Sequence, residues 1–594
     1  MLDVRGLTIS LLNPATGVYQ PIVAPLDVTL SSGQALGITG ISGGGKSTLV
    51  RALSGQLPAT ARIEATTWKL FRQDVIGPNT RRQISGRALN RRVRQIAGRR
   101  LFFIHQDART ALVPYRTIEW HLRRAALPAR PSTSDLQSVL ADMGIPSPIG
   151  VLKRYPRELS GGECQRIQLA IARWLPIELM IADEPFSFVH RERAGKLVQL
   201  LRSRVEKGNG LVFVSHHLDV LRELTDHTAV LCNGALAEWG PTETVLNSKT
   251  SCHPHTRLLL RLGDPDRRTL PVLQCQPHSQ QLACVFAGAC DLAREACDRT
   301  YPSSQSHSGQ HRVHCLFPEV TATPQAPLSA PQDDVAPASE DRFLIRAENV
   351  VAAFSSPSLW NRETDTILSP RSLSIHEGEC LGLRGESGCG KTTMARVIMG
   401  LHPIRSGTLA RFGVSDLSGN LSSAAQRRLW HRTQWISQDS DVAFDPLANV
   451  EDSLAQAFLA AGVRPSQAEL RRLCDDLLSR LRLPARLRVS LTGNLSGGER
   501  RRLAILRALA AFGFPAKSQA SNHPRLLILD EPTVGIDLFL QAFLRELLRE
   551  ARQQLGLTYL LISHDEQFLG NMCDREIFWS SRTEVPPQQE LNSN

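Results

Sequence analysis

The chain of 594 residues contains no run of about 18 apolar residues, the length that a membrane-spanning helix needs. We therefore expect no helix that crosses a membrane. The first residues, Met1-Leu-Asp-Val-Arg, also lack the basic and then apolar pattern of a secretory leader. Both absences favour a protein that stays on the cytoplasmic side of the membrane.

Closely spaced cysteine pairs are absent as well. None of the 12 cysteines stands in the C-x2-C spacing that is typical of a zinc knuckle. In a cytoplasmic chain a disulfide framework is not expected either. Eight cysteines are scattered, and four gather in one segment: Cys284, Cys290, Cys297 and Cys315.

The overall composition is ordinary for a globular protein, with 42% hydrophobic and 21% charged residues. The length exceeds what one hydrophobic core organises, so several domains are expected. The net charge of +12 has one local concentration, since eight arginines fall within residues 81–100. We favour a solvated helical face for this stretch, with contact to lipid headgroups or to nucleic acid as the alternatives.

Two glycine-rich loops of the form G-x-x-x-x-G-K-[ST] are present, Gly40–Ser47 and Gly385–Thr392. In such a loop main-chain N–H groups surround the phosphates of a nucleotide. The lysine reaches the β- and γ-phosphates, and the hydroxyl that follows it binds Mg²⁺. The candidate nucleotide-binding residues are Gly40, Ser42, Gly43, Gly44, Gly45, Lys46, Ser47 and Thr48, and Gly385, Ser387, Gly388, Cys389, Gly390, Lys391, Thr392 and Thr393.

The same four motifs follow each loop in the same order. A glutamine comes first, then Leu-Ser-Gly-Gly-Glu, then an apolar strand that ends in Asp-Glu-Pro, and then a histidine after a second apolar strand. The chain is therefore a tandem duplication of one nucleotide-binding domain. The positions are Gln106, Ser160, Gly161, Gly162, Asp183, Glu184 and His216 in the first copy, and Gln438, Ser496, Gly497, Gly498, Asp530, Glu531 and His564 in the second.

This ordered set resembles the ATP-binding-cassette (ABC) ATPases over nearly all of both halves. The resemblance implies an α/β fold with two tandem P-loop NTPase (RecA-like) ABC domains, each with a helical subdomain that carries Leu-Ser-Gly-Gly-Glu. We expect that subdomain at about 110–178 in the first half. The expected domains are 1–250 and 342–582, with a cysteine-rich extension at 251–320, a Pro/Ala-rich linker at 321–341 and a disordered tail at 583–594.

ATP hydrolysis needs charge neutralisation and an oriented water. We expect Ser47 with Asp183, and Thr392 with Asp530, to hold Mg²⁺. The remaining candidates are Glu184 and Glu531 for polarising the attacking water, His216 and His564 for the γ-phosphate, and Gln106 and Gln438 for sensing Mg²⁺ and water and reporting to a partner.

Ser160 and Ser496 are each followed by a glutamate three residues later, which also predicts a capping box at the start of a helix. Both roles are compatible, because a helix N-terminus attracts anions. In the ABC family this segment faces the phosphate loop of the other domain in a head-to-tail pair. The resemblance therefore pairs Lys46 with Ser496 and Lys391 with Ser160.

The two copies differ near their catalytic residues. The second copy has Asp537 after its acidic strand end, where the first copy has His190. Likewise His564 is followed by Asp565, and His216 by His217. One hypothesis is that the two sites hydrolyse ATP at different rates, with the Lys391/Ser160 site slower. Neutral drift is the alternative.

Two features are similar to the ATPases of oligopeptide, dipeptide and nickel importers. One is the stretch after each glutamine, Asp107–Pro114 and Asp439–Pro446, and the other is His253-Pro-His-Thr-Arg-Leu-Leu-Leu260. In that branch a cysteine-rich tail is associated with an iron–sulfur cluster. Four thiolates suit a [4Fe–4S] cluster or Zn²⁺, and metal-free cysteines are a further alternative.

The resemblance implies an ATP-hydrolysing subunit of a bacterial importer for peptides, nickel or metal chelates. It would lie on the cytoplasmic face of the inner membrane as a peripheral protein. It would dock on two membrane permease subunits through the Gln106 and Gln438 regions, act indirectly with an extracytoplasmic solute-binding protein, and bind no nucleic acid. The alternatives are a soluble twin-ABC translation or nucleic-acid factor and, less favoured, a metal-cluster sensor with vestigial ATPase halves.

Overall fold

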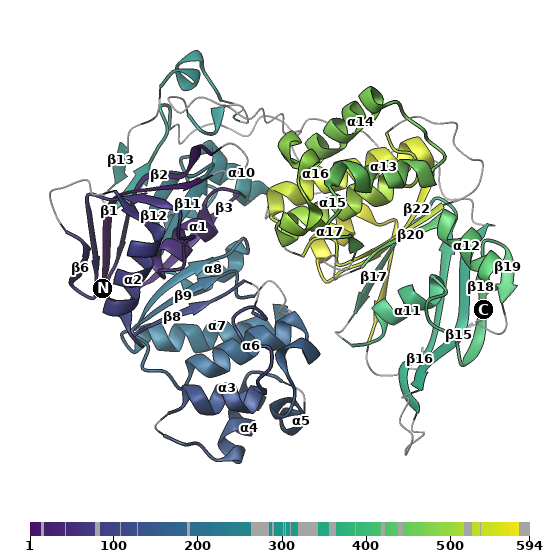
Figure 1. The fold of residues 1–594 in the computed structure, drawn as a ribbon, viewed down its shortest axis with the longest axis horizontal. Helices are drawn as coiled ribbons and strands as arrows, with labels where there is room; N and C mark the ends of the chain where they lie inside the picture. Colours follow the sequence, from purple (N-terminus) through teal and green to yellow (C-terminus); the bar gives the residue numbers. More distant parts are fainter. Residues whose placement is uncertain are drawn as a thin grey trace, which may run out of the picture. The chain divides into compact units, whose positions relative to one another are not determined.

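A computed structural model provides the fold of the chain (Figure 1). It describes residues 1–12, 17–41, 43–77, 83–106, 108–127, 129–145, 147–186, 191–262, 284–287, 290, 292–300, 302, 305–308, 310–318, 342–355, 364–385, 388–416, 422–437, 443–515, 525–534 and 536–580. Two compact units are present: Met1–Leu328 with Asp537–Phe539, and Ser329–Ile536 with Leu540–Asn594. The expected linker at 321–341 and tail at 583–594 lie outside the described residues, as do Ser42, His190, Ser387 and Gln438.

The first unit is built on two sheets. One is six-stranded, with β2 beside β1 and the order β6-β5-β1-β4-β7; its strands are β1 (Leu2–Leu12), β2 (Tyr19–Leu30), β4 (Arg62–Glu64), β5 (Thr67–Leu70), β6 (Gln73–Ile76) and β7 (Ile84–Ser85). The other is eight-stranded, in the order β13 (Gln305–Ser308), β14 (His311–Val313), β12 (Ala235–Pro241), β11 (His227–Cys232), β3 (Ala35–Gly40), β10 (Gly210–Val214), β9 (Leu179–Asp183) and β8 (Leu101–Ile104).

The middle of the eight-stranded sheet is parallel, from β11 through β3, β10 and β9 to β8. The strands β3, β9 and β10 are buried at every residue, as expected for parallel strands covered on both faces. The apolar runs at 179–182 and 211–214 are thus confirmed as strands. Strand β1 bends where Gly6 adopts φ +59°.

The helices of the first unit divide between the sheets and a separate helical group. The group comprises α3 (Ile118–Ala125), α4 (Thr133–Asp142), α5 (Pro148–Leu152) and α6 (Gly161–Ala172), which pack on one another within the predicted span 110–178 (Figure 1). The others are α1 (Lys46–Leu53), α2 (Gly86–Ala97), α7 (Arg191–Glu206), α8 (Leu218–Leu224), α9 (Thr242–Val245) and α10 (Pro254–Leu262).

The arginine-rich stretch forms α2. Its Leu89 and Val93 are buried, whereas Arg87, Arg91 and Arg94 are exposed. This is the solvated helical face that the sequence favoured.

The second unit repeats this arrangement. A five-stranded parallel sheet runs in the order β20 (Thr433–Ile436), β21 (Arg525–Asp530), β22 (Leu557–Ile562), β17 (Cys380–Gly385) and β23 (Arg575–Trp579). A four-stranded sheet contains β16 (Thr364–His376), β15 (Phe343–Ser355), β18 (Ser406–Arg411) and β19 (Val414–Asp416). The helices are α11 (Lys391–Ile398), α12 (Ser423–Arg432), α13 (Val450–Ala460), α14 (Gln467–Arg480), α15 (Gly497–Ala510), α16 (Leu538–Leu555) and α17 (Glu566–Met572).

The expected strands at 526–529 and 559–562 are confirmed as parts of β21 and β22. Helices α13, α14 and α15 pack together as the helical group of this unit (Figure 1). Among the described helices of both units, none is long and apolar enough to cross a membrane.

Candidate functional site: two phosphate loops and a cysteine cavity

The first phosphate loop joins the buried strand β3 to helix α1. Gly45 adopts φ +84°, and a side chain there would meet the carbonyl oxygen of Ile22 at 2.8 Å, so glycine is required. At Gly43 an added Cβ would meet nothing within 4 Å, which places this residue on the open side of the loop. The Nζ of Lys46 donates to the carbonyl oxygens of Gly40 at 2.9 Å and Ile41 at 2.7 Å. The lysine thus lies folded over the loop.

The second phosphate loop has the same design between β17 and α11. Gly388 and Gly390 have φ +83° and +97°. The Nζ of Lys391 donates to the carbonyl oxygen of Gly385 at 2.7 Å. Lys391, like Lys46, is 7% exposed, so each ammonium group is held in a largely dry loop.

In each unit the hydroxyl after the lysine is bonded to the aspartate at a strand end. Ser47 Oγ donates to Asp183 Oδ1 at 3.2 Å, and Thr392 Oγ1 donates to Asp530 Oδ2 at 2.8 Å. Burial raises the pKa of Asp183 to about 6, aided by the charge of Glu184, and burial also raises the pKa of Asp530. A carboxylate beside a hydroxyl is an oxygen donor set suited to Mg²⁺.

The next glutamate in each unit, Glu184 or Glu531, has an unusual backbone. Their φ angles are +46° and +53°, a region that costs non-glycine residues free energy. The main-chain N–H of each bonds across to the neighbouring strand, Glu184 to Val214 and Glu531 to Ile562. These bonds hold the backbone of both glutamates in equivalent positions just past the strand.

The surroundings of the two glutamates differ. Glu184 accepts a hydrogen bond from Gln106 Nε2 at 3.2 Å, and its Oε1 lies 3.5 Å from His216 Nδ1. Burial would raise the pKa of Glu184, but the ion pair with His216 outweighs it and lowers that pKa to about 2. Burial is the largest effect on the pKa of His216 and lowers it, but the charge and the hydrogen bond of Glu184 act against burial, and the net pKa is raised.

In the second unit Glu531 Oε1 lies 3.1 Å from Nε2 of His564, the other ring nitrogen, and Ser563 Oγ donates to Oε2 at 3.4 Å. Burial and the charge of Asp530 raise the pKa of Glu531 to about 7. The histidine of this pair is 34% exposed, against 11% for His216. The two units therefore hold the same residues in different electrostatic states.

The difference between His217 and Asp565 also has a local structural basis. Asp565 is the N-cap of α17, and its Oδ1 accepts a hydrogen bond from the N–H of Phe568 at 2.9 Å. His217 precedes α8 without a side-chain capping bond. Helix capping by Asp565 thus explains in part why the two copies differ at this position, which is one of the two differences behind the hypothesis of unequal sites.

Ser160 and Ser496 both form the capping box that the sequence predicted. Ser160 Oγ accepts from the N–H of Glu163 at 3.2 Å, and Glu163 Oε2 accepts from the N–H of Ser160 at 2.8 Å. Ser496 and Glu499 repeat this geometry at 3.3 and 2.8 Å. Both serines are exposed, so within its own unit the N-terminus of each helix faces outward.

Two further residues near these sites carried no sequence signal. Tyr19 begins β2, the strand whose Ile22 abuts Gly45, and the guanidinium of Arg62 lies 3.5 Å over its ring. Arg501 on α15 is buried and bonds to main-chain oxygens at the end of β21. A tyrosine at the start of a strand and an arginine in a helix are too common to be singled out from sequence.

The four clustered cysteines line one cavity of the first unit. Its other lining residues are His253, Pro254, Phe286, Ala287, Leu292, Leu316 and Phe317. Cys284, Cys297 and Cys315 are buried, and Cys290 is half-buried. Burial raises the pKa of the Cys284 and Cys315 thiols, and the other cysteines raise it further. Four thiols in one small apolar cavity match the donor set of an iron–sulfur cluster or of zinc.

Comparison with known proteins identifies the class. Residues 23–187 and 368–534 match the ABC transporter family, which covers more than half of the chain. The chain belongs to this family, and it is an ATPase. The fold is the α/β fold expected, with two ABC domains in tandem.

Among particular relatives, the chain is 27% identical to the oligopeptide transport ATP-binding protein OppD of Mycobacterium tuberculosis, over 91% of this chain and 88% of that protein. It is also 27% identical to the glutathione import ATP-binding protein GsiA of Salmonella choleraesuis, over 100% of this chain and 87% of that protein.

Solved structures show the same twin-domain fold in other proteins. An archaeal ribosome recycling factor, crystallised with a ribosomal stalk protein, has a TM-score of 0.53 and 19% identity, covering 96% of this chain and 86% of that one. An RNase-L inhibitor has a TM-score of 0.52 and 18% identity, covering 94% and 85%. At these identities the likeness concerns the fold.

Proposed function

We propose that this protein is the ATP-hydrolysing subunit of an importer for small peptides or peptide-like solutes, with metal chelates and nickel as further cargo classes. The observation that carries the proposal is the set of ATPase side chains among the described residues of both units, joined to a cysteine-rich extension that resembles that of the oligopeptide branch. The similarity to OppD and GsiA along almost the whole chain supports it.

In the proposed mechanism the main-chain N–H groups of each loop bind the phosphates of ATP. Lys46 and Lys391 turn from the loop carbonyls to the β- and γ-phosphates. Mg²⁺ would be held by Ser47 and Asp183 or by Thr392 and Asp530, and it would neutralise the charge that develops on the phosphates.

Glu184 or Glu531 accepts a proton from the attacking water, and the products are ADP and phosphate. His216 and His564, each beside its glutamate, would contact the γ-phosphate. Gln106 would signal occupancy, because its amide already bonds to Glu184. We assign Gln438 the same signalling role, because it has the same position in the order of motifs.

Each ATP would also need the signature segment of the other unit, Ser160–Gly162 or Ser496–Gly498. The exposed helix N-termini support this assignment, since a helix N-terminus attracts anions. ATP would hold the two units together head to tail, and hydrolysis would release them.

We assign the four-cysteine cavity to a [4Fe–4S] cluster, with zinc as the alternative occupant. Cys284, Cys290, Cys297 and Cys315 would be its ligands. A cluster there would have a structural role rather than a redox role, because transport driven by ATP requires no electron transfer. It would crosslink the segments of the extension. Iron and sulfide analysis with the absorbance near 400 nm on anaerobically purified protein distinguishes the two occupants.

Exposed apolar side chains on both helical groups support docking to membrane permeases. Tyr115 is 75% exposed and Leu447 is 79% exposed, and each follows a proline that ends the stretch after Gln106 or Gln438. Ile149 and Val489 add 62% and 71% exposure in the same groups. Such residues mark a protein-binding surface when they gather.

The test is co-purification of permease subunits from detergent-solubilised membranes. The double variant Tyr115→Arg with Leu447→Arg should lose the permeases and keep its ATP binding. Val414→Arg is the matched control, because Val414 is 67% exposed on β19, away from the helical group. Recovery of ribosomes instead of permeases would favour the alternative of a soluble translation factor.

A further inference from the structure

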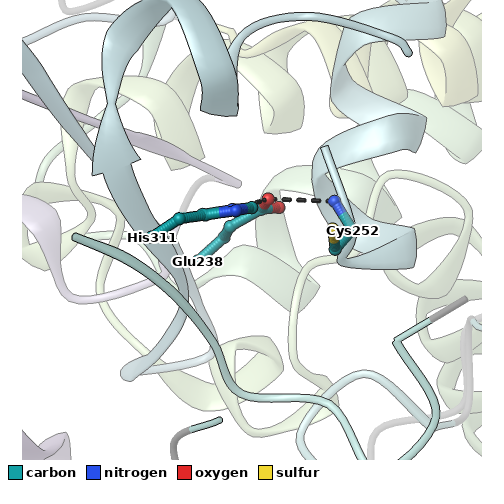
Figure 2. Close-up of side chains that lie close together, drawn as sticks. All are labelled: Glu238, Cys252 and His311. Carbon is teal, nitrogen blue, oxygen red and sulfur yellow. Dashed lines mark hydrogen bonds and ion pairs between the residues drawn. The ribbon is translucent and has the colours of Figure 1, made fainter. Parts of the chain in front are cut away.

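Glu238 is the centre of a buried cluster that joins the cysteine-rich extension to the ATPase sheet. It lies on β12 with 0% exposure, and it accepts hydrogen bonds from the N–H of Cys252 at 3.0 Å and from Nε2 of His311 at 2.8 Å (Figure 2). It also accepts one from the N–H of His253 at 3.1 Å. His311 lies on β14, and His253 immediately precedes α10. One carboxylate therefore holds two segments of the extension, Cys252–His253 and the strand that carries His311.

The donor atoms of Glu238, Cys252 and His311 all lie within 4.8 Å of one another, a spacing that a metal ion could bridge. Both carboxylate oxygens already accept hydrogen bonds, however, and Glu238 and His311 are in direct contact at 2.8 Å, which leaves no gap for an ion between them. Buried carboxylates satisfied in this way are structural anchors. The cluster is a hydrogen-bonded anchor, and the cysteine cavity lies directly beside it, since Cys252 packs against Cys315.

A second connection runs from the cavity to the first phosphate loop. Asn233, in the turn between β11 and β12, donates from Nδ2 to the carbonyl oxygen of Val285 at 2.9 Å, next to Cys284. The adjacent Gly234 donates from its N–H to the carbonyl oxygen of Gly44 in the loop at 3.3 Å. The turn is thus bonded on one side to the cavity wall and on the other side to the phosphate loop.

Phosphate-loop geometry is sensitive to this turn because the packing is tight. A Cβ at Gly40 would lie 1.9 Å from the carbonyl oxygen of Leu231, and a Cβ at Gly234 would lie 2.3 Å from that of Ile22. A shift of the turn therefore moves the loop as well. Asn233 and Gly234 therefore connect the segment beside Cys284 to the phosphate loop.

We infer that Asn233 is a positioning residue through which the occupant of the four-cysteine cavity sets the ATP affinity of the Lys46 site. Filling the cavity draws the thiols together and fixes Val285, which holds the turn and the loop in the geometry that binds phosphate. By thermodynamic linkage, ATP bound at the Lys46 site also strengthens retention of the occupant. This inference rests on the metal site proposed above.

The experiment measures binding of a fluorescent ATP analogue to the full chain in the Lys391→Ala background, where only the Lys46 site reports. The apoprotein is compared with protein loaded anaerobically with Fe²⁺ and sulfide or with Zn²⁺, and metal content is measured in each sample. Loading should tighten binding at least about fivefold, the lower end of typical coupling between sites. The Lys46→Ala background is the internal control, because the Lys391 site should not respond.

Asn233→Gly and Asn233→Asp isolate the connection. Asn233 has φ +45°, which glycine tolerates and aspartate adopts more readily than most residues, so neither change strains the turn. Both variants should bind metal as the unmodified chain does, but their ATP affinity should no longer depend on loading. A general folding defect would instead weaken both affinities and lower the melting temperature.

Metal bound with no change in ATP affinity would overturn the coupling and leave the metal site intact. A persistent effect of loading in Asn233→Gly would overturn the role of Asn233. Metal content no higher than in a Cys284→Ser/Cys297→Ser double variant would overturn the metal site and the coupling together.

Discussion

Arg501 donates a hydrogen bond from Nη2 to the main-chain oxygen of Asp530 at 3.0 Å, and the same group bonds to the main-chain oxygen of Glu531. Arg501 stands in the second turn of α15, the helix that begins after Ser496. Arg501 therefore connects the first turns of α15 to the acidic strand end of the second unit by hydrogen bonds. A movement of the signature segment Ser496–Gly498 should therefore displace Glu531, the residue expected to polarise water.

Replacing Arg501 by methionine should destabilise the second unit by about 1–3 kcal/mol, because buried carbonyl oxygens lose their donor. Arg501→Lys should recover part of this loss, since it restores one donor. Urea denaturation of both variants measures the effect. Equal stability of Arg501→Met and the unmodified chain would contradict the assigned role.

Glu184→Gln and Glu531→Gln test the hypothesis of unequal sites. If the Lys391/Ser160 site is the slower one, Glu184→Gln should lower steady-state ATP turnover at least about tenfold, because loss of a general base costs about 10²–10⁴-fold at the Lys46 site and only the slower site remains. Glu531→Gln should lower turnover much less. Phosphate release at saturating ATP is the measurement. Equal losses from both substitutions would favour neutral drift.

Ser496→Arg tests the head-to-tail pairing. A bulky cation in the signature segment of the second unit should block closure over the nucleotide of the Lys46 site and abolish its hydrolysis, while the Lys391 site retains ATP binding. Ser160→Arg should give the mirror result. Measurements in the Lys391→Ala and Lys46→Ala backgrounds assign the loss, and a defect confined to the site of the same unit would refute the pairing.

We expect His121 to make the free energy of unfolding depend on pH. It is buried in the first helical group, where Nε2 accepts from the N–H of Val113 at 2.9 Å and Nδ1 lies 2.8 Å from the main-chain oxygen of Thr117. Burial lowers its pKa, although the bond to Thr117 opposes the effect. The unfolded chain, with a pKa of about 6.5, takes up a proton that the folded chain resists, so stability is full above that pH and falls below it.

The measurement is the urea midpoint at pH 7.5 and pH 5.5 for the unmodified chain and for His121→Gln. Glutamine offers both a donor and an acceptor and does not titrate. The unmodified chain should lose more stability on acidification than the variant does. An identical loss in both would remove His121 as a cause.

The sequence predicted the elements whose signals are local. Continuous apolar runs identified β9, β10, β21 and β22, and Ser-x-x-Glu identified the starts of α6 and α15. The Gly-rich loops predicted where strands give way to helices at Lys46 and Lys391. These signals rest on hydrogen bonds and burial within a few residues.

Features that depend on contacts between residues far apart in the chain could not be predicted from the sequence. The anchor at Glu238 needs residues 238, 252, 253 and 311 to meet, and the bond from Asn233 to Val285 spans 52 positions. At Glu184 burial is outweighed by the charges and hydrogen bond around it, chiefly those of His216, whereas burial and the charge of Asp530 raise the pKa of Glu531, and no motif records this difference. Roles of the site residues themselves stay predictions that the variants above test.

Strand β14 pairs with the outer edge of β12 through Glu238 and Trp239. An unpaired edge strand is a template for a strand of another molecule, and proteins cover such edges to avoid aggregation. The extension thereby covers this edge of β12, apart from anything its cysteines bind. A fragment cut near residue 250 would expose β12, and we expect it to form oligomers that the intact chain avoids.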